Sequence, residues 1–90
     1  MTEDISSTVA STATEKALAG IWAAVLERDV ESIGRDDDFV VLGGSSLEAT
    51  VCVVRVEQTL GVRLPVNALI IGDGTLHRIA GRIDALRTHA

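Results

Sequence analysis

Ser46 is the candidate reactive side chain of this sequence, because two glycines and a second serine directly precede it. Gly43 and Gly44 allow a sharp turn and a close backbone approach. Ser45, three residues before Glu48, forms a capping-box pattern, so its hydroxyl is expected to bind backbone N–H groups of a helix. Ser46 would then occupy the first helical position with a free, outward-pointing hydroxyl, where the helix dipole favours an attached phosphate.

The sequence offers Ser46 no group that would activate it as a nucleophile. No histidine stands in a recognisable triad order with it, and no cluster of metal ligands is apparent. Cys52 lies on an expected buried helix face and is assigned to packing. His77 and His89 are expected to be solvated rather than to act as ligands. The acidic run at 36–38 lacks the spacing of a calcium loop and is interpreted as a solvated turn.

The first element expected to support this site is a helix at about 14–28, where apolar residues recur at three- and four-residue steps. Residues 1–13 are rich in Ser, Thr and Ala without such a period, so we interpret them as a flexible leader. A long loop is expected at 29–45, since it carries three glycines and the acidic run. Its apolar residues are expected to dock on the helices: Phe39, Val40, Val41 and Leu42.

A second helix is expected at 46–60, although its β-branched residues favour a strand on propensity alone. Gly61 should end it. The evidence for a helix is an apolar stripe with helical spacing, which is expected to face the core: Ala49, Cys52, Val53, Val56 and Leu60.

Two further helices complete the expected fold. A short helix should cover 66–70, because Pro65 is tolerated in a first turn. Gly72 and Gly74 should separate it from a last helix that has Thr75 as its N-cap. The expected core face of the last helix is Leu76, Ile79, Ala80, Ile83 and Leu86. The predicted fold is all-α: a four-helix bundle with three longer helices, one short helix and a long loop after the first.

Composition and charge narrow the possible functions. Ninety residues fit one domain with a small core, and only 2% are aromatic, so that core must be largely aliphatic. A net charge of −5 disfavours nucleic-acid binding. The single cysteine precludes an internal disulfide and fits the cytoplasm. The N-terminal segment has no apolar stretch, so no membrane association is expected. We expect a monomer.

The run Phe39, Leu42, Gly43, Gly44, Ser46 and Leu47 resembles the phosphopantetheine attachment motif of peptidyl carrier proteins, the thiolation domains of nonribosomal peptide synthetases. The resemblance extends over residues 14–90, which would form the carrier domain with the fold of acyl carrier proteins. It includes the Ile21 and Trp22 pair and the Leu64 and Pro65 pair.

This resemblance implies that a phosphopantetheinyl transferase attaches a 4′-phosphopantetheine arm from coenzyme A to Ser46. The thiol of the arm would hold an aminoacyl, peptidyl or acyl group as a thioester in natural-product biosynthesis. Partner enzymes would load and process that group: an adenylation enzyme, condensation or other tailoring enzymes, and a thioesterase. The carrier itself would not be an enzyme. The chain departs from the pattern of these carriers at two places, both on surfaces that such families use for partner choice. Ser45 replaces the usual His or Asp, and residues 70–74 lack the usual aromatic residue and proline.

One side of the second helix is expected to contact partner enzymes. Leu47, Val51 and Val54 lie roughly opposite the core stripe, which predicts an exposed apolar strip beside Ser46. The alternative is that neighbouring elements bury this side as well.

Three interpretations of the whole chain follow. We expect a free-standing peptidyl carrier protein, since the sequence begins at Met1 and ends just past the last helix, although an excised domain would look similar. The alternatives are an acyl carrier protein of polyketide or fatty-acid synthesis, and a small helical interaction module without a prosthetic group.

Overall fold

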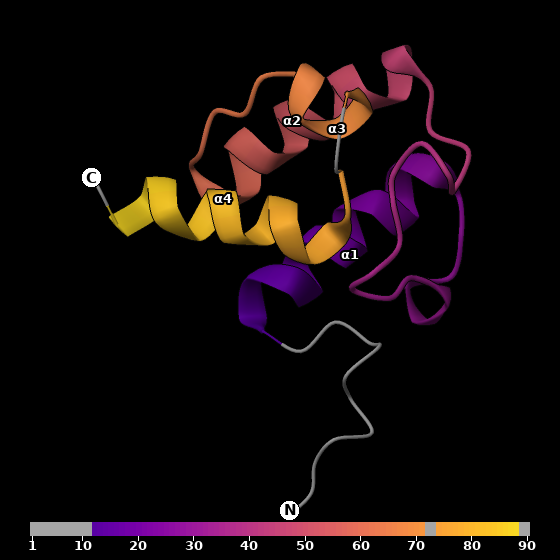
Figure 1. Cartoon of the computed structure of the whole chain (residues 1–90), viewed down its shortest axis with the longest axis horizontal. Helices are drawn as coiled ribbons and strands as arrows, with labels where there is room; N and C mark the ends of the chain where they lie inside the picture. The colour runs from indigo at the N-terminus through magenta and orange to yellow at the C-terminus, as the bar shows by residue number, and fades with distance from the viewer. Residues whose placement is uncertain (1–11, 72–73, 89–90) are drawn as a thin grey trace, which may run out of the picture.

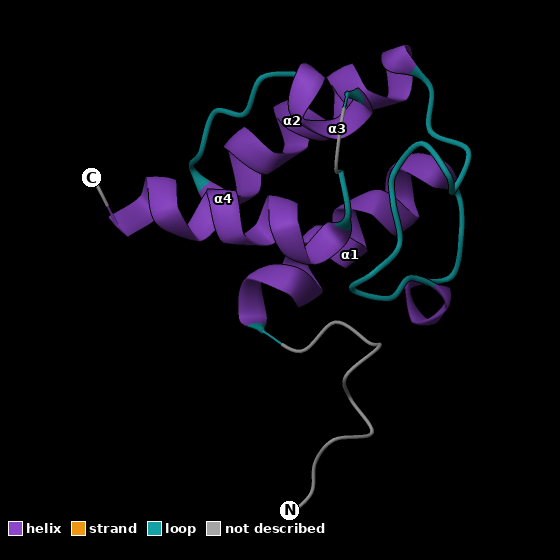
Figure 2. Cartoon of the chain, in the orientation of Figure 1, coloured by secondary structure: helices purple, strands orange, loops and turns teal. Residues whose placement is uncertain are grey.

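The computed structural model describes residues 12–71 and 74–88, whose regular elements are all helical (Figures 1 and 2). An isolated antiparallel bridge pairs Asp38 of the long loop with Thr75. The expected all-α architecture and the long loop after the first helix are confirmed. The elements, in chain order, are α1 (Ala13–Leu26), the 3₁₀ turn η2 (Val30–Ser32), α2 (Ser46–Leu60), α3 (Asn67–Ile70) and α4 (Leu76–Thr88).

Helix α1 begins one residue earlier than expected and ends two residues earlier. Thr12 is its N-cap, and the Thr12 hydroxyl accepts a hydrogen bond from the N–H of Glu15 at 2.9 Å. The helix ends because Glu27 adopts the left-handed conformation, with φ of 57°, and donates its N–H to Ala23. Most of the expected leader, residues 1–11, lies outside the described residues.

Helix α2 has the predicted boundaries. At its start the Ser45 hydroxyl accepts from the N–H of Glu48 at 3.2 Å, and the Glu48 carboxylate accepts from the N–H of Ser45 at 2.9 Å. At its end Gly61 is left-handed, with φ of 73°. The predicted stripe faces the core: Ala49, Cys52 and Val56 are fully buried, while Val53 and Leu60 are partly buried at its edges.

The core is centred on Trp22 of α1 and Phe39 of the long loop, both fully buried. Their rings meet edge to face, with centroids 5.2 Å apart, a geometry favoured by the ring quadrupoles. Helix α1 packs against both α2 and α4, as Figure 1 shows. The prediction that Leu86 faces the core was wrong: it is 48% exposed, residues 84–87 are all exposed, and the packed face of α4 ends at Ile83.

The N-terminus of α4 is capped by the long loop rather than by the expected hydroxyl of Thr75. Leu76 donates its N–H to the carbonyl of Asp37 at 2.9 Å, and His77 donates to the carbonyl of Arg35 at 3.0 Å. The Thr75 hydroxyl is buried without a hydrogen-bond partner in the described ranges. The loop therefore supplies acceptors that a side-chain N-cap would otherwise provide.

Helix α3 has a single turn at Asn67–Ile70, one residue shorter than expected, and it buries Ala68 and Leu69. Gly72, which was expected to follow it, lies outside the described residues. Among the helices that the structure describes, none is long and apolar enough to cross a membrane.

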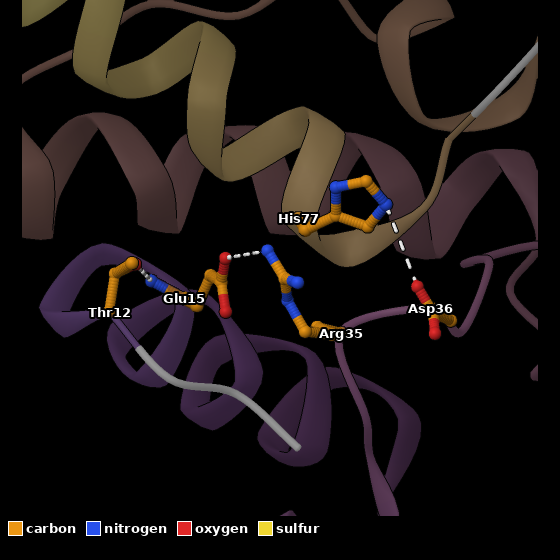
Figure 3. Close-up of polar contacts among 5 residues, drawn as sticks. All are labelled: Thr12, Glu15, Arg35, Asp36 and His77. Atoms are coloured by element: carbon orange, nitrogen blue, oxygen red, sulfur yellow. Dashed lines mark hydrogen bonds and ion pairs between the residues drawn. The ribbon is translucent and has the colours of Figure 1, made fainter. Parts of the chain in front are cut away.

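Two ion pairs tie the long loop to α1 and α4 (Figure 3). The buried carboxylate of Glu15 lies 3.1 Å from the guanidinium of Arg35. On the other side, Asp36 lies 3.6 Å from the imidazole of His77, and this contact carries opposite charges when the histidine is protonated. His77 is half-buried in this contact, so it is only partly solvated. His89 lies outside the described residues.

Candidate functional site

Ser46 is the first residue of α2, and its side chain is exposed. The preceding serine carries the capping contacts, since Ser45 exchanges two hydrogen bonds with Glu48. The backbone carbonyl of Ser46 accepts from the Thr50 hydroxyl at 3.0 Å. The Ser46 hydroxyl itself makes no hydrogen bond to any other described residue. The structure thus separates the capping serine from the accessible one, as the sequence predicted.

The two glycines before the serines serve different purposes. Gly43 has a φ of 102°, a conformation that side chains disfavour. Gly44 lies against the ring of Phe39, where a Cβ atom would come within 2.3 to 2.8 Å of three ring carbons. The first glycine therefore permits the turn, and the second permits the buried aromatic ring to pack directly beneath the backbone that leads to Ser46.

A hydrogen-bonded turn from Asp38 to Gly44 delivers the chain to α2. Leu42 donates its N–H to the carbonyl of Asp38, and Gly44 donates to that of Phe39, both at 2.9 Å. Arg28, just past α1, donates from its guanidinium to the carbonyl of Leu42 at 3.0 Å. The segment before Ser46 is thus a structured turn, not a simple linker.

The acidic run was interpreted as a solvated turn, and this is correct only for Asp36. The Asp37 carboxylate accepts from the N–H of Gly34 at 2.8 Å, and the Asp38 carboxylate accepts from the N–H of Val40 at 2.9 Å. Both acids are half-buried. Short acidic side chains commonly organise turns in this way, which is the signal that the sequence already contained.

The apolar strip on α2 is exposed, so neighbouring elements do not bury it within the described structure. Leu47 is 74% exposed, Val51 41% and Val54 48%. Two loop residues that were expected to dock on the helices are exposed as well: Val40 at 46% and Val41 at 82%. Both lie within the turn before Ser46. Their exposure could not be read from the sequence, because a turn has no regular period.

The remaining candidates for chemistry lie elsewhere or are inert. Cys52 is buried, and this burial raises the pKa of its thiol to about 12, so almost none of it is thiolate at neutral pH. No group of three or more His, Cys, Asp or Glu side chains that could hold a metal ion occurs in the described ranges. Ser46 is therefore the exposed functional group that the turn and the helix present together.

The capping box gives a first prediction. Replacing Ser45 by alanine should lower the free energy of unfolding by about 0.5 to 2 kcal/mol, because the N–H of Glu48 loses its acceptor. Urea denaturation followed by circular dichroism measures this loss. An unchanged unfolding midpoint would show that the capping box contributes nothing to the start of α2.

Comparison with known proteins identifies the family. Residues 16–83 match the family model described as "Phosphopantetheine attachment site". The chain is 41% identical over 81% of its length to phosphinothricin tripeptide synthetase PhsC of Streptomyces viridochromogenes, and 44% identical over 76% to tyrocidine synthase 3 of Brevibacillus parabrevis. It spans only 6% and 1% of the length of these two relatives.

Solved structures share the fold. A peptidyl carrier protein with an active-site mutation, solved in solution, superimposes with a TM-score of 0.80 at 30% identity, covering 93% of this chain and 89% of the other. A chain from the complex of the phosphopantetheine transferase Sfp with coenzyme A and a peptidyl carrier protein gives a TM-score of 0.79 at 29% identity, covering 87% and 97%. The match over most of its length shows that this chain belongs to the phosphopantetheine attachment family, as a peptidyl carrier protein of the acyl-carrier-protein-like superfamily.

Proposed function

We propose that Ser46 is the attachment residue and that the chain carries aminoacyl or peptidyl groups in nonribosomal peptide synthesis. The observation that supports this most directly is the exposed Ser46 hydroxyl at the start of α2, which Ser45 leaves free by taking the capping contacts. In the proposed step the Ser46 oxygen attacks the pantetheine-linked phosphorus of coenzyme A. A phosphodiester bond forms, adenosine 3′,5′-bisphosphate leaves, and a base of the transferase takes the hydroxyl proton.

The residues around Ser46 fit such a group. Ser46 is exposed, and Gly43, which is also exposed, adds no side chain that would crowd a phosphate. The N-terminus of α2 stabilises a negative charge there by about 0.3 to 1 kcal/mol. When attached, the arm supplies a thiol that holds an acyl group as a thioester.

In this proposal the chain acts as a substrate of other enzymes and not as a catalyst. One relative named above is a tripeptide synthetase, which favours amino-acid cargo over the fatty or polyketide acyl groups of the alternative interpretation. The expected partners beyond the transferase are an adenylation enzyme, condensation or tailoring enzymes and a thioesterase. We also propose a cytoplasmic location, which the single free cysteine fits.

The exposed strip is proposed to contact the loading enzymes, and this yields a second prediction. Val51→Glu should lower kcat/KM for loading by the transferase on the order of 10-fold, because a charge would replace apolar contact at an interface. Ala24→Glu places the same charge on the exposed side of α1 and serves as the control. Equal rates for both variants, with both folded, would exclude the strip as a contact surface.

The proposed function is tested by the stoichiometry of loading. The protein is incubated with coenzyme A and a transferase of broad specificity, and its intact mass should increase by one phosphopantetheine group. Since Cys52 is buried with a pKa of about 12, a thiol reagent at neutral pH should label the folded protein only after this reaction. No mass increase, or the addition of several groups, would contradict the proposal.

A further inference from the structure

The carboxylate of Asp38 joins two segments that are far apart in the sequence. Its Oδ1 atom accepts from the N–H of Val40 at 2.9 Å and, more weakly, from that of Val41 at 3.4 Å. Its Oδ2 atom accepts from the N–H of Gly74 at 3.3 Å, just before α4. The side chain thus contacts the turn before Ser46 with one oxygen and the start of α4 with the other.

The backbone of Asp38 makes it the first residue of that turn. Its carbonyl accepts from the N–H of Leu42 at 2.9 Å, while its side chain accepts from a backbone N–H two residues on, as at a helix N-cap. Asp38 also forms the isolated bridge with Thr75, which fixes its own place against α4. The turn closes at Gly44, two residues before Ser46.

We propose that Asp38 is a positioning residue for the loading of Ser46. This inference rests on the proposed attachment at Ser46. With its Oδ1 atom Asp38 caps the turn, and the capped turn fixes where the Ser46 hydroxyl lies once the transferase has docked. The longer Oδ2 contact with Gly74, at 3.3 Å, links the capped turn to the start of α4 and is not needed for the cap itself. Asp38 does not belong to the exposed apolar strip, so its loss should affect the reaction in the docked complex more than docking itself.

The test is the steady-state loading of purified full-length variants by a transferase of broad specificity, with coenzyme A saturating. Asp38→Ala removes the cap and should lower kcat on the order of 10- to 100-fold with KM for the carrier changed by no more than about twofold, because misplacing a reacting atom costs this much. Asp38→Asn should retain kcat near wild type, because its amide oxygen can still accept from Val40. Asp36→Ala is the matched control, since Asp36 contacts His77 and not the turn.

Rates are measured at a temperature where circular dichroism shows each variant folded, so that a merely structural role would lower the unfolding temperature and leave kcat unchanged. A wild-type kcat for Asp38→Ala overturns the inference, and so does a kcat for Asp38→Asn as low as that of Asp38→Ala. If Asp38→Ala does not fold, Asp38→Ser takes its place in the comparison. Its hydroxyl caps the turn, so it should load at the wild-type kcat, and a reduced kcat overturns the inference. If the wild-type protein accepts no phosphopantetheine group, that result contradicts the proposed function and not the role of Asp38.

Discussion

Replacing Ser46 by alanine is expected to abolish loading with phosphopantetheine while leaving the fold intact. The Ser46 hydroxyl makes no hydrogen bond to the described residues, so its removal costs the folded state no contact there. Loading, in contrast, requires that oxygen as the nucleophile. The measurement is the intact mass of the variant after incubation with coenzyme A and the transferase, with circular dichroism to verify folding.

Ser45→Ala is the matched control for this experiment, because it removes the neighbouring hydroxyl, which is engaged in capping. It should accept one group, as the wild type does, in spite of its lower stability. If the Ser46→Ala protein were loaded and the Ser45→Ala protein were not, the roles assigned to the two serines would be reversed.

Replacing Phe39 by alanine is expected to lower the free energy of unfolding by about 3 to 5 kcal/mol, as for other buried aromatic residues. The ring is fully buried, meets Trp22 edge to face, and lies directly beneath Gly44. Its removal leaves a cavity where the long loop is anchored to α1. Chemical denaturation at 25 °C measures the loss, which would be a large fraction of the stability of a domain of this size.

The control for Phe39 is Val41→Ala, in the same turn, because Val41 is 82% exposed. Its effect should stay within about 0.5 kcal/mol, the usual range for surface positions. Comparable losses for the two variants would show that Phe39 does not anchor the loop in the way its burial indicates. Since the ring supports Gly44, Phe39→Ala should also slow loading at temperatures where it remains folded.

The sequence was most informative where local signals stand close together. The boundaries of α2 could be predicted because both ends are specified locally, by the capping box of Ser45 and Glu48 and by the left-handed Gly61. Helical spacing also identified the buried stripe correctly, although Val51 and Val54 favour a strand by propensity. Packing of the stripe against α1 outweighs that preference. The exposure of Ser46 followed from the same capping argument.

The differences arise where contacts between distant segments decide the structure. The end of α1 at Leu26 depends on a left-handed Glu27, and the sequence has no glycine there to signal it. The N-terminus of α4 binds carbonyl groups of Arg35 and Asp37, which lie about forty residues earlier and leave no local pattern. The single turn η2 was not predicted, because three residues are too few to show a period.

The central claim is that the prosthetic group is attached to the Ser46 oxygen, and the most direct test is to locate the group on the loaded wild-type protein. Proteolysis followed by fragmentation in a mass spectrometer assigns the added mass to a single residue, and distinguishes Ser46 from Ser45 through the fragment that separates them. We predict that all of the added mass lies on Ser46. Added mass on Ser45, on Cys52 or on any other residue would contradict the account.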